Sequence, residues 1–238
     1  MPVSEWLHLE DVGGNPWILP VWTASKAAVD AGQVPPLGPE FGELALYITT
    51  RLDIIHRIRR RLSEESSALC EAARKHGPGH VFTETNCGRA FPVNGDLKYC
   101  LIADVDALLF ELDACWTLMR KLYQRLRAHV GMPVEDADVT AALKDALGSS
   151  TDWWFRWLDR QRNFVAHAGA LYLAIDLTGG QLEILVMREN LRTFADVTRY
   201  FRFSELREVS AAFDGLTQAL QGALIELFGE SEGANHTQ

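Results

Sequence analysis

The sequence predicts a mainly α-helical protein, an antiparallel helical bundle with a single β-hairpin inserted late in the chain. Long stretches repeat apolar residues every three or four positions, which is the spacing of one helix face. Near residues 171–187 the spacing changes to strict alternation, which is the period of a strand. Hydrophobic residues make up 47% of the 238 residues, enough to build a sizeable core.

The N-terminal region, residues 1–37, is rich in the glycines and prolines that interrupt regular structure. We expect an irregular arm there, with room for a short helix at about 23–31. Its large apolar residues predict that the arm packs on the body of the protein: Trp6, Trp17, Ile18 and Trp22. The helical domain is expected at 38–229, and a disordered tail at 230–238.

Helical periodicity and turn residues divide the domain into five expected helices. Their approximate ranges are 39–75, 97–129, 135–147, 152–168 and 204–228. Turn-forming residues separate the first two helices, and Ser204 is the expected N-terminal cap of the last helix. The last helix should turn one apolar stripe inward: Leu206, Val209, Phe213, Leu216, Leu220, Leu224 and Leu227.

The expected hairpin, residues 171–187, has a turn at Thr178-Gly179-Gly180. An isolated hairpin is only marginally stable in water. We therefore expect this one to lie on the helices or to pair across a dimer.

Charge and cysteine content narrow the class of protein. The net charge of −9 excludes a uniformly basic nucleic-acid-binding coat, but it permits a local basic site. The four cysteines lack the spacing of a zinc or redox motif, and we expect reduced core thiols: Cys70, Cys87, Cys100 and Cys115. Neither a signal peptide nor an apolar stretch of about 18 residues is visible, so a cytoplasmic protein with no membrane segment is expected.

One expected helix, 152–168, carries residues of the types that take part in catalysis. Arg156, Arg160, Asn163 and His167 are spaced four, three and four apart, so they fall on one stripe. The opposite side is aromatic and apolar: Trp154, Trp157, Leu158, Phe164 and Val165. Such a stripe is commonly a solvated helix face. A histidine beside guanidinium groups also suits phosphoryl transfer, which needs a proton carrier and fixed positive charge.

The segment Arg162-Asn163-Phe164-Val165-Ala166-His167 resembles the motif of the HEPN superfamily. That motif has an Arg, a polar residue, a few further residues and a His near the end of a helix in a helical bundle. Many members are metal-independent endoribonucleases in which the RNA 2′-hydroxyl attacks and a cyclic phosphate is left. The match covers six residues of the chain.

The resemblance implies a role for each matching residue. His167 would be the general base or acid, Arg162 would stabilise the transition-state phosphate, and Asn163 would position the other two. It also implies a homodimer in which two motifs share one cleft, an RNA substrate, and neither metal nor cofactor.

The chain departs from the family pattern in three respects. Arg162 and His167 are five residues apart, about 140° around a helix, so Arg162 lies off the polar stripe. It reaches the same site by its long side chain, by a distorted helix end, or from a partner subunit. A hairpin follows the motif, and Gly169 stands where toxins of the minimal nucleotidyltransferase systems have Tyr.

Some HEPN proteins have lost catalysis and keep the fold for binding. The alternative function is therefore a non-catalytic helical interaction protein, part of a toxin–antitoxin or defence module with an antitoxin protein as partner. The acidic net charge and the position of Arg162 favour this alternative.

Two other sets of charged residues, one basic and one acidic, have more than one interpretation. Arg59 and Arg60, in the only concentrated basic run, would join Arg156 and Arg160 in holding an RNA backbone, or they belong to an exposed helix face. Four acidic residues on helix 97–129 would bind a metal, hold Arg162 or form ordinary ion pairs: Asp104, Asp106, Glu111 and Asp113.

A loop with potential metal ligands follows helix 39–75. His76, His80 and Cys87 would form a zinc site, although a polar loop is the commoner structure for such a Gly- and Pro-rich turn.

Overall fold

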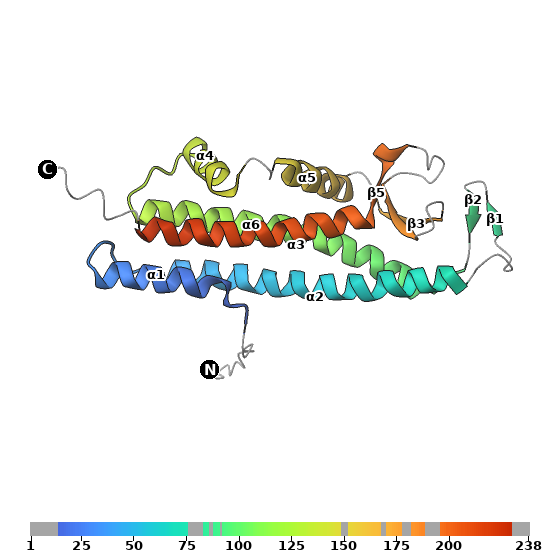
Figure 1. The fold of residues 1–238 in the computed structure, drawn as a ribbon, viewed down its shortest axis with the longest axis horizontal. Coiled ribbons are helices and arrows are strands. Elements are labelled where there is room, and N and C mark those ends of the chain that lie inside the picture. The colour runs from blue at the N-terminus through green and yellow to red at the C-terminus, as the bar shows by residue number, and fades with distance from the viewer. Residues whose placement is uncertain are drawn as a thin grey trace, which may run out of the picture.

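The computed structural model describes residues 14–75, 83–85, 88–90, 92–148, 152–167, 170–177, 182–188 and 196–229. Over these residues the chain is mainly helical, with six α-helices and a three-stranded antiparallel sheet. The long helices lie side by side in an elongated molecule, and the strands gather toward one end (Figure 1). The expected mainly helical fold is therefore confirmed.

The α-helices are α1 (Leu19–Asp30), α2 (Pro39–Lys75), α3 (Gly95–His129), α4 (Asp136–Leu147), α5 (Asp152–His167) and α6 (Phe203–Gly229). The strands are β1 (Thr83–Thr85), β2 (Gly88–Ala90), β3 (Tyr172–Asp176), β4 (Glu183–Met187) and β5 (Tyr200–Arg202), with 3-10 turns η1 (Pro16–Ile18) and η3 (Val197–Arg199). Apolar periodicity predicted all five helices of the expected domain to within two residues at either end.

The pair α2 and α3 forms the long axis of the molecule. The two helices run antiparallel, because Arg51 pairs with Glu111 at 2.6 Å while Arg61 pairs with Asp104 at 2.6 Å. Fully buried leucines and isoleucines recur along both helices and seal the contact: Ile48, Ile55, Leu101, Leu108, Leu112 and Leu122. Burial of such side chains contributes about 1.5–3 kcal/mol each.

Helix α6 lies along α2 and α3, and every residue of its predicted inward stripe is buried. It begins at Phe203, one residue earlier than expected, so Ser204 is inside the helix rather than its cap. The Ser204 backbone N–H instead donates to Glu183 Oε1 of β4 at 3.0 Å. The start of α6 is thereby tied to the sheet.

The N-terminal region is more regular than expected. Residues 19–30 form helix α1, which packs against α6. It covers most of the short helix expected at about 23–31 and begins four residues earlier, within the part expected to be irregular. Pro20 stands in the first turn of α1, where proline is compatible with a helix. It therefore does not interrupt the helix, contrary to the expectation from the sequence. The expected packing on the body is confirmed for Trp17 and Ile18, which are buried, whereas Trp6 lies outside the described residues.

The predicted hairpin is present as β3 and β4, which pair antiparallel from Tyr172 opposite Met187 to Asp176 opposite Glu183. The expectation of a single hairpin is wrong in two ways. β5 adds a third strand beside β4, and β1 pairs with β2 in a separate two-stranded sheet. Three-residue strands are too short to show an alternating pattern.

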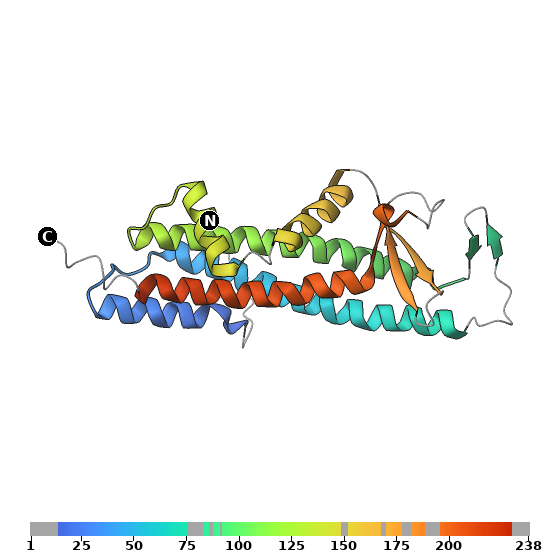
Figure 2. The ribbon, with the colours of Figure 1, turned by 45° about the horizontal axis from the view of Figure 1, so that its top comes forward.

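Helices α4 and α5 form a second layer over the long helices. α4 packs against α6, and α5 packs against both α3 and α6. Figure 2 shows α5 inclined to the long helices, ending toward the side of the sheet. The helix that carries the candidate motif therefore has one face fixed by two others.

Candidate functional site

The buried face of α5 is anchored by tryptophans. Trp154 is 1% exposed, and its Nε1–H donates to the Val209 carbonyl of α6 at 2.7 Å. Its ring stacks on Phe213 with 5.8 Å between centroids. Trp157 Nε1–H donates to Glu205 Oε2 at 3.2 Å. The predicted aromatic face is thus confirmed, and it fixes the direction in which the opposite side of α5 points.

One polar residue on the buried side of α5 was missed by the sequence interpretation. Gln161 is 3% exposed, and within the described residues its Oε1 has no hydrogen-bond partner. No periodic signal identifies it, because a single polar residue in an apolar stripe is indistinguishable from a boundary position.

The predicted polar stripe of α5 faces outward. Arg156, Arg160 and His167 are exposed, and Asn163 is partly buried. Arg160 donates through Nη2 to the Thr198 carbonyl at 3.1 Å, so this guanidinium is tied to η3. His167 is the last residue of α5. Both Asn163 and His167 are within the described residues, and no hydrogen bond joins them there.

Arg162 points away from that stripe, as the helical spacing predicted. Its Nη2 lies 3.3 Å from Asp159 Oδ1, one turn earlier on α5. Its Nε lies 3.4 Å from Asp113 Oδ2 of α3, and its side chain is 33% exposed. Arg162 and His167 of one chain therefore lie on different sides of α5, and one helix alone does not bring them to one phosphate.

The acidic residues of α3 serve mainly as ion-pair partners. Asp104, Glu111 and Asp113 each pair with an arginine, respectively Arg61, Arg51 and Arg162. The ion-pair interpretation is confirmed for these three. Asp106 differs, because burial raises the pKa of its carboxyl group and no described residue hydrogen-bonds to its Oδ1.

Metal ligands do not converge in the described part of the chain, which contains no group of three or more His, Cys, Asp or Glu side chains able to hold an ion. The histidine-rich loop with His76, His80 and Cys87 lies outside the described residues.

The two arginines of the basic run have different surroundings. Arg59 points toward α6, where its Nη1 pairs with Asp214 Oδ1 at 2.7 Å and its Nη2 donates to the Ser210 carbonyl. Arg60 is exposed on α2. The guanidinium of Arg59 is thus engaged between two helices, whereas that of Arg60 faces outward.

The cysteines differ in their exposure. Cys115 is buried, and burial raises the pKa of its thiol to about 12, so it is an unreactive core group. Cys100 is exposed, which corrects the expectation of a core thiol at that position, and Cys70 is partly buried. Cys87 lies outside the described residues.

Among the described helices, none has both the length and the apolar character required to cross a lipid bilayer. Comparisons with protein-family models, with curated proteins and with solved structures found no match to this chain.

Proposed function

We propose that this chain is a metal-independent endoribonuclease of HEPN type that acts in the cytoplasm. The observation that carries the proposal is the exposed His167 at the end of α5, one turn after Asn163, on a helix whose other face is fixed by Trp154. An exposed imidazole on a helix that is packed against the bundle is accessible to a substrate.

The proposed reaction is transfer of the phosphoryl group within RNA. The 2′-hydroxyl oxygen attacks the adjacent phosphorus, the bond from phosphorus to the 5′-oxygen breaks, and a 2′,3′-cyclic phosphate remains. His167 takes the proton from the 2′-hydroxyl or gives one to the leaving 5′-oxygen. Arg162 stabilises the negative charge on the phosphorane, and Asn163 positions the two.

The proposal requires two copies of the chain. Because Arg162 is turned toward Asp113 while His167 is exposed, one chain alone does not bring the two side chains together. The proposal therefore places them on one phosphate across a homodimer in which two α5 helices face each other. Each site would then take His167 from one copy and Arg162 from the other.

The RNA backbone would follow the exposed side of α5. Arg156 and Arg160 lie on the same stripe as His167 and supply local positive charge on a chain with a net charge of −9. Arg60 of α2 extends this surface in the proposal, whereas Arg59 is engaged with Asp214.

Cleavage of structured RNA in the presence of EDTA tests the proposal. The wild-type protein should cut RNA and leave a cyclic phosphate. His167→Ala should lower the rate by about 10²–10⁴-fold, since a general acid–base group is lost. Arg162→Ala should lower it by about 10²–10³-fold, and mixing the two variants should restore part of the activity if the site is shared.

His56→Ala is the matched control, because His56 is an exposed helical histidine on α2 rather than on α5. It should cut RNA at the wild-type rate. A folded wild-type protein that leaves RNA intact, or a His167→Ala variant that cuts as fast as the wild type, would contradict the ribonuclease proposal.

A non-catalytic interaction protein is the second candidate, with an antitoxin-like protein as partner. It is favoured by the two carboxylates beside Arg162, because Asp113 and Asp159 already neutralise the charge that catalysis requires. This candidate predicts a folded protein without RNA cleavage. It also predicts that Arg162→Met changes stability by less than about 1 kcal/mol, the usual contribution of a partly exposed ion pair.

A further inference from the structure

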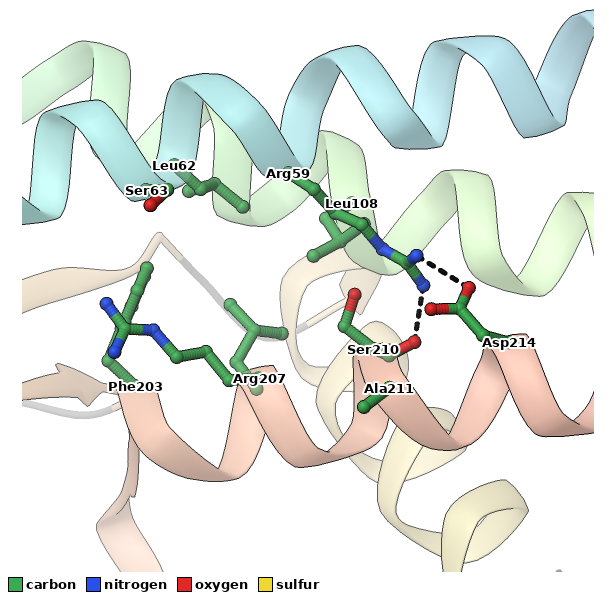
Figure 3. A pocket seen from close by; sticks show the side chains of 10 residues that line it. Arg59, Leu62, Ser63, Leu108, Phe203, Arg207, Ser210, Ala211 and Asp214 are labelled. Carbon is green, nitrogen blue, oxygen red and sulfur yellow. Dashed lines mark hydrogen bonds and ion pairs between the residues drawn. The ribbon is translucent and has the colours of Figure 1, made fainter.

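A groove of about 300 Å³ runs between α2 and α6, with Leu108 of α3 at its floor (Figure 3). This volume is at the lower end of the range of small-molecule sites, about 300–1,000 Å³. Apolar side chains that line it include Leu62 from α2, and Phe203 and Leu206 from α6. The groove is separate from the stripe of α5, because no α5 residue lines it.

Two buried polar groups at one end of the groove have unused hydrogen-bonding capacity. Ser210 is 7% exposed, and its Oγ has no hydrogen-bond partner among the described residues. Figure 3 shows that the hydroxyl group points from α6 toward Arg59 of α2. The Nε of Arg59 is also buried and has no partner in the part of the chain that the structure describes, although the terminal nitrogens of this arginine are engaged. Unpaired buried polar groups are costly and infrequent, so two on neighbouring residues indicate a missing partner.

The positive charge lies toward the other end of the groove. Arg207 is exposed, donates through Nη2 to Ser66 Oγ at 3.3 Å, and lies over the Phe203 ring at 5.2 Å. Figure 3 places its guanidinium beside Phe203, well away from that of Arg59. Because Asp214 compensates Arg59, the excess charge of the lining is the single positive charge of Arg207.

We propose that this groove binds a small, elongated carboxylate that has a hydroxyl group at its far end. Arg207 receives the carboxylate, the leucines contact the apolar chain, and Ser210 Oγ with Arg59 Nε bonds the distal hydroxyl. A single carboxylate matches the one uncompensated positive charge, whereas a dianionic phosphate leaves excess negative charge near Asp214. The distal hydroxyl both donates and accepts, so it satisfies the two unused groups.

NMR titration of the full chain with three probes tests this site: octanoate, ω-hydroxyoctanoate and octan-1-ol. We expect ω-hydroxyoctanoate to bind more tightly than octanoate, and octan-1-ol to bind most weakly. Arg207→Gln should weaken both carboxylates about tenfold, because a charged hydrogen-bond donor is lost. Ser210→Ala should weaken ω-hydroxyoctanoate about threefold and leave octanoate unchanged.

Arg57→Gln is the matched control, since Arg57 is exposed on α2 and does not line the groove. It should bind all probes as the wild type does. Arg207→Lys keeps the charge and should still bind octanoate better than octan-1-ol, which tests the site even if Arg207→Gln fails to fold. Equal affinity for octanoate and octan-1-ol, or unchanged binding in both Arg207 variants, overturns the proposal.

Discussion

At the scale of single residues, helix geometry determines which partners a side chain finds. Arg162 is five positions before His167, and the resulting turn of about 140° directs it to Asp113 of α3 instead of the outward stripe. The sequence predicted that Arg162 lies off the stripe. It did not single out Asp113 from the other three acidic residues of α3, because that choice depends on how α5 lies across the helix.

Asp106 provides a residue-scale prediction. Burial raises the pKa of its carboxyl group above 3.8, so the charged form is disfavoured in the folded state. The resulting loss of stability is absent below pH 3.8 and accumulates as the pH rises through the folded-state pKa. Asp106→Asn should therefore raise the free energy of unfolding at pH 7, measured by urea denaturation.

The gain from Asp106→Asn should shrink when the same measurement is made near pH 4, because the raised pKa favours uptake of a proton by the wild-type carboxyl group in the folded state as the pH falls. Asp138→Asn is the control, because Asp138 is exposed on α4, and it should change stability little at either pH. An equal difference between Asp106→Asn and wild type at both pH values would contradict titration of Asp106 as the cause.

At the scale of elements, α5 was predictable because its two faces differ strongly in polarity. The aromatic face and the polar stripe repeat at the helical period, and packing against α3 and α6 follows that division. The third strand, β5, was not predictable. It is three residues long, and it is a strand because β4 offers an edge with matching register, such as Leu185 opposite Arg202.

Trp154 provides the element-scale prediction. It is almost fully buried, stacks on Phe213 and donates to the Val209 carbonyl. Trp154→Ala should lower the free energy of unfolding by about 3–5 kcal/mol, through the lost burial and the remaining cavity. Trp154→Phe should cost about 1–2 kcal/mol, because it keeps the ring contact but loses the hydrogen bond.

Trp153 provides the control for this pair, since it is the preceding residue on α5 and is 44% exposed. Trp153→Ala should change stability by less than about 0.5 kcal/mol in the same denaturation experiment. If Trp153→Ala and Trp154→Ala were equally destabilising, α5 would not be anchored by the face described above.

At the scale of the whole molecule, the N-terminal region joins the bundle. Trp17 Nε1–H donates to the Thr217 carbonyl of α6 at 2.9 Å, and Gln221 Nε2–H donates to the Trp17 carbonyl. Two segments about 200 residues apart in sequence are thereby fixed together. The helical bundle is complete only when the region before α2 packs against the last helix, α6.

The packing of the N-terminal region on α6 predicts that Trp17→Ala has a large effect on stability. The variant should lower the free energy of unfolding by about 3 kcal/mol, since a buried aromatic side chain and its hydrogen bond are lost. Leu19→Ala, at a residue that is 57% exposed, should change stability little. Thermal unfolding of both variants checks this, and a low-temperature transition for α1 alone would show that the N-terminal region folds separately.

The sequence alone predicted the five helices α2 to α6 and the β3–β4 hairpin. It also predicted that α5 has one buried and one exposed face. Each of these depends on a local period of apolar residues. The third strand, the partner of Arg162 and the inward turn of Arg59 depend instead on contacts between distant segments. Arg59 and Asp214 are 155 residues apart in sequence, and only the packing of α6 along α2 brings them together.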